Sequence, residues 1–416
     1  MYNNEYESFI PRRGLATKKI DCVNIAIVYL LIYSTAYATL GSYNSTLSII
    51  LSLSSYVFVG LVINALPSIA ISITKPAFFL IITFILIYVG SFIVAKDIEV
   101  HALALSGIVR FCIPAFLLGL SIRNADDLLK KLKIASWIIL ACEFFSIFIL
   151  SSNQLVFYSY SQDTGYQALL PFIVLICEFY RNKRVADLFG TIFSTLLILM
   201  SGARGPLFCA IISFVIYCIF IIGKDNRKKI YLMVLFFFAA LMVLLFYENI
   251  LESLISLFQS IGASTRSIEG LLYSTISDDE NRTRMKMIAW EYAKGHPFLG
   301  SGFINDRRII HDTVSAKAAT AYGTYCHNFF FEILMQFGLF PGSLIGLYCI
   351  NKLIKSISTD VPIYARNLAI VLITMGFLPL MVSRSYLTHS YFYLLIGFLL
   401  AQTRTNEYYL RMLEDL

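Results

Sequence analysis

The chain has 416 residues, of which 58% are hydrophobic and only 14% are charged, and it carries a formal net charge of +7. Soluble domains carry about 25% charged residues, so this composition excludes an ordinary soluble enzyme and indicates an integral membrane protein. A membrane β-barrel is also excluded, because its strands would appear as alternating segments of about ten residues. No basic patch interleaved with aromatic residues is evident, so nucleic acid is not an expected partner.

Apolar runs of helical length recur along the whole chain. A helix needs roughly 20 mainly apolar residues to cross a bilayer. We therefore expect an all-α polytopic protein with about twelve spans and one large outer loop that is partly helical. The expected organisation is an N-terminal bundle of about nine spans (1–248), a loop (249–326), and about three C-terminal spans with a tail (327–416). The predicted spans are 23–39, 47–66, 76–95, 102–121, 134–151, 165–180, 186–200, 206–223, 230–248, 328–350, 363–382 and 386–402.

Lysine and arginine alternate between the two sides of these spans. Connections on one side hold 21 of the 33, whereas the short connections on the other side hold Lys96, Arg204 and Arg384. Because basic connections face the cytoplasm, we expect both termini to be cytoplasmic and the 249–326 loop to face outward. No cleavable signal is expected, since the first apolar run leads into further spans.

Cysteine and histidine give no sign of a disulfide framework or of a metal site. Six of the eight cysteines fall in apolar spans, where cysteine acts as a small hydrophobic residue. No Cys-x-x-Cys pair occurs, and the histidine spacing matches no usual zinc pattern. We expect neither a metal nor a cofactor.

The outer loop carries a helical pattern. Met285, Ile288, Ala289 and Tyr292 recur at helical spacing, and the run Gly295-His296-Pro297 is expected to end this helix. Trp290 and Tyr292 suit a position at the membrane interface.

Arg204 lies in the turn Ser201-Gly202-Ala203-Arg204-Gly205-Pro206 between two spans. Glycines permit close backbone approach and exposed amides, and arginine can hold a phosphate through two parallel hydrogen bonds. An arginine at a helix end can also reach the headgroups with no further role. Positive charge on the outer side is not required by topology, so we favour a phosphate-binding role for Arg204.

Four other arginines are candidates for substrate binding. Arg282 and Arg284 precede the loop helix, where they can reach a diphosphate at the membrane surface or remain solvated loop charges. Arg110 lies within a span, an unfavourable position that indicates either substrate contact or an ion pair with Glu143. Arg384 lies on a short outward turn.

His327 lies where the loop enters the predicted span at 328–350. Its imidazole can accept a proton from an attacking sugar hydroxyl, although a lone histidine here can equally be a cap or a polar lining residue. Glu332 lies about one helical turn deeper and is expected to orient the imidazole. Tyr166, on another outward connection, can stack on a sugar or belong to an interfacial aromatic belt.

Together, these motifs resemble the bacterial O-antigen ligase/polymerase superfamily of membrane glycosyltransferases. The run 201–205 looks like the family's arginine-bearing turn, and Arg284 followed by Gly300 has the arginine–glycine spacing of polymerase loops. The run 296–302 looks like the family's Pro-x-x-Gly-x-Gly segment. His327-Asn328 with Gly338 resembles the His-Asn–Gly-x-x-Gly element, except that Pro341 stands at the second glycine position and Gly342 follows it.

The resemblance implies a substrate, a location and roles for residues. The donor would be a glycan on undecaprenyl diphosphate, transferred without a metal on the periplasmic side of the bacterial inner membrane. Arg204, Arg284 and then Arg282 would neutralise the leaving diphosphate, and His327 would act as general base, with Asn328 beside it in the substrate site. Membrane lipid and a chain-length regulator protein are the other partners implied. Attack opposite the leaving group would invert the anomeric centre.

Three functions remain open at this point. A polymerase would transfer the growing glycan to a new lipid-linked repeat unit, and the Arg284–Gly300 spacing and the altered second glycine favour it. A ligase would transfer the glycan to lipid A–core instead. A polysaccharide or lipid transporter would carry polar residues through many spans, whereas this chain gathers them in one loop.

Overall fold

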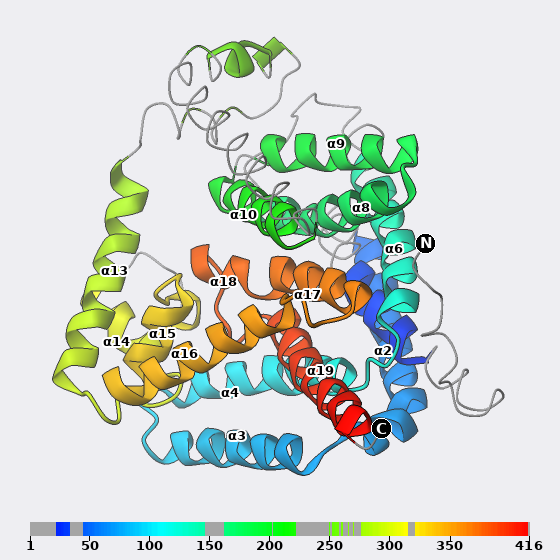
Figure 1. The fold of residues 1–416 in the computed structure, drawn as a ribbon. Helices are drawn as coiled ribbons and strands as arrows, with labels where there is room; N and C mark the ends of the chain where they lie inside the picture. Colours follow the sequence, from blue (N-terminus) through cyan, green and yellow to red (C-terminus); the bar gives the residue numbers. More distant parts are fainter. Residues whose placement is uncertain are drawn as a thin grey trace.

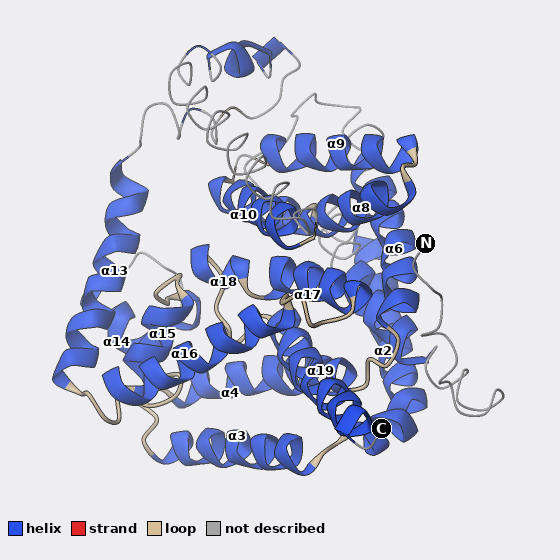
Figure 2. Ribbon diagram, in the orientation of Figure 1, coloured by secondary structure: helices blue, strands red, loops and turns tan. Residues whose placement is uncertain are grey.

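The computed structural model describes residues 22–33, 45–145, 162–201, 203–221, 276–314 and 321–414, together with residues 249, 252–257, 259, 260, 265 and 269. Every regular element in this described part is a helix, and none of it is a strand (Figure 1, Figure 2). The predicted all-α class is therefore confirmed for the described residues.

The N-terminal half begins with the apolar helix Cys22–Tyr33 and continues with α2 (Ser45–Ser72) and α3 (Lys75–Ile93). Thr74 caps α3 by accepting a hydrogen bond from the Ala77 amide, and Asp97 caps α4 (Ile98–Gly107) through the Val100 amide. The π-helical segment η2 (Ile108–Cys112) joins α4 to α5 (Ile113–Leu120). The helix α6 (Ala125–Phe145) follows.

Four helices form the next group, α7 (Gln162–Gln167), α8 (Leu169–Asn182), α9 (Val185–Met200) and α10 (Arg204–Phe220). The helices α8, α9 and α10 pack together at the top of the view in Figure 1. Lys183 has a φ of +54° where α8 gives way to α9, which reverses the chain direction.

The C-terminal half holds the described part of the predicted loop and the last helices. The loop contributes α13 (Ile276–Gly295), α14 (Asn305–Val314) and the short η5 (Ala321–Gly323), which lead into α15 (Phe329–Phe337). The helix α13 ends at Gly295, as the sequence predicts. The chain continues through α16 (Leu339–Ser356), α17 (Ile363–Gly376), α18 (Leu378–Val382) and α19 (Ser390–Glu414).

Eight apolar helical stretches coincide with predicted spans. Four of them are long and apolar enough to cross a membrane, by length and composition: Ile49–Ser72, Lys75–Ile93, Ile98–Leu120 and Ile363–Val382. Four shorter ones are Cys22–Tyr33, Val185–Met200, Arg204–Phe220 and Ser390–Gln402. The predicted span at 230–248 lies outside the described residues, so the total of about twelve stays a prediction.

The predicted single span at 328–350 is wrong, because the chain breaks into α15 and α16 at Gly338. Gly338 has a φ of +88°, a conformation that other residues rarely adopt. A Cβ there would lie 2.7 Å from the Pro297 carbonyl oxygen and 2.8 Å from that of His296. The break therefore depends on glycine twice, for its backbone angle and for the close approach of the loop.

The motif at 296–302 has a structural role at this break. The Ser301 amide donates to the Met335 carbonyl at 2.7 Å, and the Gly302 amide donates to that of Gln336 at 3.0 Å. The Phe340 amide returns a bond to the Pro297 carbonyl at 3.0 Å. The loop thus satisfies carbonyl groups at the end of α15 that the helix itself leaves unpaired, and it fixes α15 relative to α13.

The loop also binds the turn between α3 and α4. Asn305 donates to the Val94 carbonyl at 3.0 Å and accepts from the Lys96 amide at 2.9 Å. The His101 Nε2 atom lies 3.2 Å from the Phe303 carbonyl oxygen. These bonds join segments about 200 positions apart.

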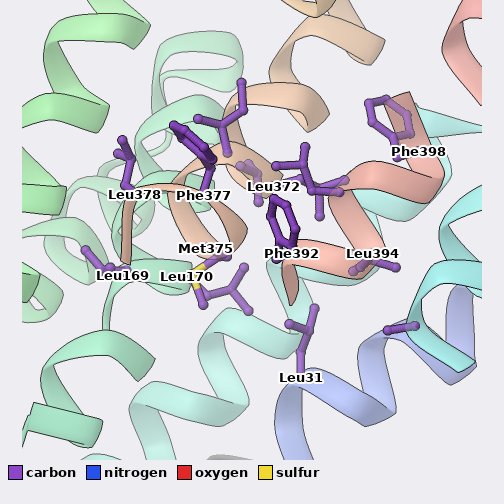
Figure 3. Packing of buried hydrophobic residues seen from close by; sticks show 14 of the residues in the cluster. Leu31, Leu169, Leu170, Leu372, Met375, Phe377, Leu378, Phe392, Leu394 and Phe398 are labelled. Atoms are coloured by element: carbon purple, nitrogen blue, oxygen red, sulfur yellow. The ribbon is translucent and has the colours of Figure 1, made fainter. Parts of the chain in front are cut away.

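The main hydrophobic core lies where α8, α17, α18 and α19 meet the N-terminal helices. Figure 3 shows Leu169 and Leu170 of α8 beside Met375 of α17, with Phe392 and Leu394 of α19 on the other side. All five are buried. This core holds the short connection between α18 and α19, which carries much of the candidate site.

Candidate active site

The turn Ser383-Arg384-Ser385 after α18 connects the candidate residues. The Ser383 carbonyl accepts a hydrogen bond from the Tyr325 hydroxyl at 2.7 Å and lies 3.1 Å from the His327 Nδ1 atom. The Ser383 hydroxyl lies 2.5 Å from the hydroxyl of Tyr166. One residue thus holds side chains that come from the loop and from α7.

His327 adopts a φ of +52°, and its ring centroid lies 4.3 Å from that of Tyr325. A carbonyl oxygen can only accept, so the bond to Ser383 places the proton on Nδ1 and leaves the Nε2 lone pair able to accept another. Burial lowers the pKa of His327 below its ordinary value. The hydrogen bond to Ser383 opposes that shift, whereas the charges of Arg282, Arg307 and Lys286 add to it. The imidazole is therefore neutral near pH 7, as a general base must be.

Asn328 holds the start of α15 in place. Its side-chain oxygen accepts from the Phe330 and Phe331 amides at 3.0 and 3.4 Å, and its nitrogen donates to the Met381 carbonyl at 3.0 Å. Asn328 thus has a structural role, whereas its role in substrate binding stays a prediction. The side chain caps α15 and ties it to α18, beside His327.

Glu332 does not orient His327, and this expectation needs correction. Its carboxylate is fully buried and accepts a hydrogen bond from the Ser385 hydroxyl at 2.5 Å. Arg307 lies 3.8 Å away from the same carboxylate oxygen. Glu332 therefore contacts Ser385, and the backbone carbonyl of Ser383 orients the His327 imidazole instead.

Arg307 and Asp306 were missed by the sequence analysis, although both are fully buried at the site. Arg307 donates to the Ser385 hydroxyl at 2.7 Å, and its guanidinium carbon lies 5.0 Å from the Tyr325 ring centroid. Asp306 accepts from Gln336 at 2.7 Å, and burial raises its pKa. The only sequence signal is the polar start of α14, Asn305-Asp306-Arg307, among several charged segments of the loop.

The turn that carries Arg204 lies against this cluster. Arg204 is the first residue of α10 and is half-buried. A Cβ on the next residue, Gly205, would lie 2.6 Å from the Tyr166 hydroxyl oxygen, which itself contacts Ser383. The predicted arginine turn and the predicted base are therefore joined through Tyr166 and Ser383, although they are more than 100 positions apart in sequence.

Tyr166 and Arg384 contact each other. Tyr166 is only 5% exposed, and the Arg384 guanidinium carbon lies 5.2 Å from its ring centroid. The ring is largely buried but forms part of the wall of a cavity, so stacking of Tyr166 on a sugar stays a prediction. Arg384 also forms an ion pair with Asp163 of α7.

Arg282 and Arg284 point in different directions, because two positions along a helix correspond to nearly opposite faces. Arg282 is half-buried, and its charge acts on His327, together with that of Lys286 one turn later. Arg284 is exposed and lies 3.4 Å from the Thr313 carbonyl oxygen. Arg282 is therefore the better placed of the two with respect to His327, and Arg284 lies towards α14.

Arg110 is exposed in η2, whereas Glu143, its expected partner in α6, is fully buried. The neighbouring Cys112 Sγ lies 3.7 Å from the Leu387 carbonyl oxygen, so η2 packs against the connection between α18 and α19. Among the described residues, no three histidine, cysteine or acidic side chains cluster as metal ligands would. Metal independence stays a prediction.

The apolar helices are those of a helical membrane protein, and its polar candidate site lies where the loop residues meet the turn after α18. Residues 189–345 match the family model described as O-antigen ligase. This match supports membership of the chain in the O-antigen ligase/polymerase superfamily, as the motifs indicate, and members of this family are membrane glycosyltransferase-like enzymes. A comparison with curated proteins found no match. The matched segment contains Arg204, Arg282, Arg307 and His327, whereas Tyr166 and Arg384 lie outside it.

Proposed function

We propose that this protein polymerises lipid-linked glycan repeat units. It would transfer the growing glycan from undecaprenyl diphosphate to a sugar hydroxyl of a new lipid-linked unit, in O-antigen or capsule synthesis. The observation that carries the proposal is the state of His327. Its Nδ1 proton is engaged by a backbone carbonyl, its Nε2 atom can accept a proton, and the positive charges of Arg282, Arg307 and Lys286 act on it.

In the proposed reaction, His327 Nε2 takes the proton of the acceptor hydroxyl while that oxygen attacks C1 of the donor sugar. The new C1–O bond forms as the bond from C1 to the diphosphate oxygen breaks, and the diphosphate leaves with the electron pair. Attack from the opposite side inverts the anomeric centre. His327 then returns its proton to water.

The leaving diphosphate gains negative charge as its bond breaks, and placed cations stabilise that charge. The positive charges of Arg282 and Lys286 act on His327, and Arg204 begins α10 next to Gly205, which lies against Tyr166. Arg284 would act at the edge of this region, near Thr313. The proposal needs no metal ion, because the lipid diphosphate is already a good leaving group.

A ligase remains the second candidate, and the description of the matching family model favours it. The spacing from Arg284 to Gly300 and the replacement of the second motif glycine by Pro341 favour the polymerase. In the structure, Gly342 packs against α15, where a Cβ would lie 2.9 Å from the Ile333 carbonyl oxygen. Gly342 thus allows α16 to pack closely against α15, one position after the second glycine of the motif.

The deciding experiment uses purified protein in detergent with lipid-linked repeat units as the sole substrate, and separates the products on a gel. A ladder of lengthening glycans supports the polymerase. Transfer that occurs only after lipid A–core is added would make the protein a ligase, and no transfer in either assay would contradict both.

Matched variants assign the residues in the same assay. His327→Ala, Arg204→Ala and Arg282→Ala should each lower the transfer rate and shorten the glycan ladder while the protein remains folded. Arg308→Ala is the control, because Arg308 is an exposed loop arginine that pairs with Asp312 and Asp97. Full activity of the arginine variants would remove their role at the diphosphate.

A further inference from the structure

A cavity of about 280 Å³ opens between α7 and the turn that follows α18. Its lining includes Asp163 and Gln167 of α7, Arg384 of the turn, and Thr388, Ser390 and Tyr391 at the start of α19. This volume is close to the lower end of the range of small-molecule sites, roughly 300–1,000 Å³, which suits one small ligand rather than an oligosaccharide.

The wall of the cavity is more apolar than polar, and Met375 and Pro379 form part of it, while its two charged side chains balance each other. Arg384 and Asp163 form an ion pair within its wall, so neither charge is available for an ionic ligand. His389, also in the lining, has its Nε2 atom 2.7 Å from the Met375 carbonyl oxygen. The remaining polar groups are hydroxyls and an amide, which suit a ligand rich in neutral hydroxyl groups.

The α13 side of the site differs from this cavity, because positive charge acts on His327 there. The charges of Arg282 and Lys286 both act on His327. An anionic diphosphate is therefore favoured near α13, whereas the balanced cavity near α7 gives it no net attraction.

The cavity and the imidazole share one anchor. Tyr166 and Arg384, both in the cavity wall, contact each other. The Tyr166 hydroxyl lies 2.5 Å from the Ser383 hydroxyl, and the Ser383 carbonyl fixes His327. A ligand in the cavity is thus held by residues directly connected to the proposed base.

We propose that this cavity binds one uncharged sugar ring of the acceptor repeat unit. It would hold the acceptor while the donor diphosphate binds on the α13 side of His327. This inference rests on the proposed transferase function and adds a specificity to it, because the paired charges of Arg384 and Asp163 give an acidic sugar no net attraction.

The test measures binding without turnover. The probe is the repeat-unit oligosaccharide released from its lipid, and saturation-transfer NMR with the purified full-length protein reports its affinity. Thr388→Trp should fill the cavity from its exposed edge and weaken binding by at least about tenfold, equivalent to about 1.4 kcal/mol. Gln167→Leu, which keeps the shape but removes the amide, should weaken binding in the same direction.

Two controls match these variants. Thr359→Trp places the same side chain at an exposed position after α16 and should leave affinity unchanged. Arg282→Ala should reduce transfer but keep oligosaccharide binding. Excess inorganic pyrophosphate should not displace the oligosaccharide.

The outcomes separate this inference from the proposed function. Wild-type affinity in Thr388→Trp, displacement by pyrophosphate, or no binding to the wild-type protein would each overturn the acceptor site. In the transfer assay, Thr388→Trp should raise the KM for the repeat unit more than it lowers kcat. A protein that binds the oligosaccharide at the cavity but forms no product would refute the transferase and leave the binding site standing.

Discussion

Replacing Arg307 with methionine should destabilise the protein strongly. Arg307 is 1% exposed, lies 3.8 Å from the Glu332 carboxylate, and sits over Tyr325. Methionine fills part of the space but leaves Asp306 and Glu332, both fully buried, without this cation. Removing one partner of a buried ion pair typically costs about 3–5 kcal/mol, and the lost contact with the tyrosine ring adds about 0.5–2 kcal/mol.

Reversible urea unfolding in mild detergent would measure this loss. The double variant Arg307→Met/Glu332→Gln should recover part of it, because the nearest uncompensated carboxylate is gone. A double-mutant cycle for residues in contact typically gives a coupling of about 0.5–3 kcal/mol. Arg308→Met, on the same helix, is the control and should cost less than about 1 kcal/mol, since its ion pairs are exposed.

The reasoning would be refuted if Arg307→Met unfolded within about 0.5 kcal/mol of the wild type, the usual effect of a surface substitution. It would also be refuted if Glu332→Gln gave no recovery. The first result would mean that Arg307 is not buried against the acidic pair, and the second that Glu332 is not its partner.

Four further predictions concern chemistry and backbone. His327→Ala should lower the transfer rate by about 10²–10⁴, the usual share of a general base, and wild-type activity should fall only below pH 6.5 because the pKa of His327 is lowered. Arg282→Ala removes a charge that disfavours the imidazolium, so the pKa of His327 should rise and the acid limb of the pH–rate profile should move to higher pH. Gly338→Ala should cost at least about 1–3 kcal/mol of unfolding free energy, from backbone strain alone, whereas alanine at the exposed helix position Ser343 should not. EDTA should not inhibit the purified enzyme, and strong inhibition would contradict a metal-free reaction.

The sequence predicted features that depend on local pattern. Apolar runs located eight apolar helical stretches, and Gly295-His296-Pro297 located the end of α13. The motifs around Arg204 and His327 each lie at the start of a helix, where local residue types are recognisable in the sequence. The fold then brings the two motifs together. In these places, the signal lies within a few neighbouring residues.

Features that depend on contacts between distant segments could not be predicted from local sequence pattern. The helix break at Gly338 lies against the carbonyls of His296 and Pro297, and nothing in the run 328–350 indicates their presence. Arg282 and Arg284 differ only in helical phase, and the sequence does not state which face of α13 lies towards His327. Arg307 is one of several loop cations, and only its burial against the Tyr325 ring distinguishes it.

The anchor of His327 has a consequence for the proposed reaction. A carboxylate partner would raise the pKa of the imidazole strongly, whereas the Ser383 carbonyl fixes its orientation without a full charge. Glu332 is engaged by Ser385 and Arg307 instead. If the donor diphosphate binds beside Arg282, its negative charge offsets the cations that lower the pKa of His327. The imidazole would then become a stronger base only when the donor is present, which would link proton removal from the acceptor to a filled donor site.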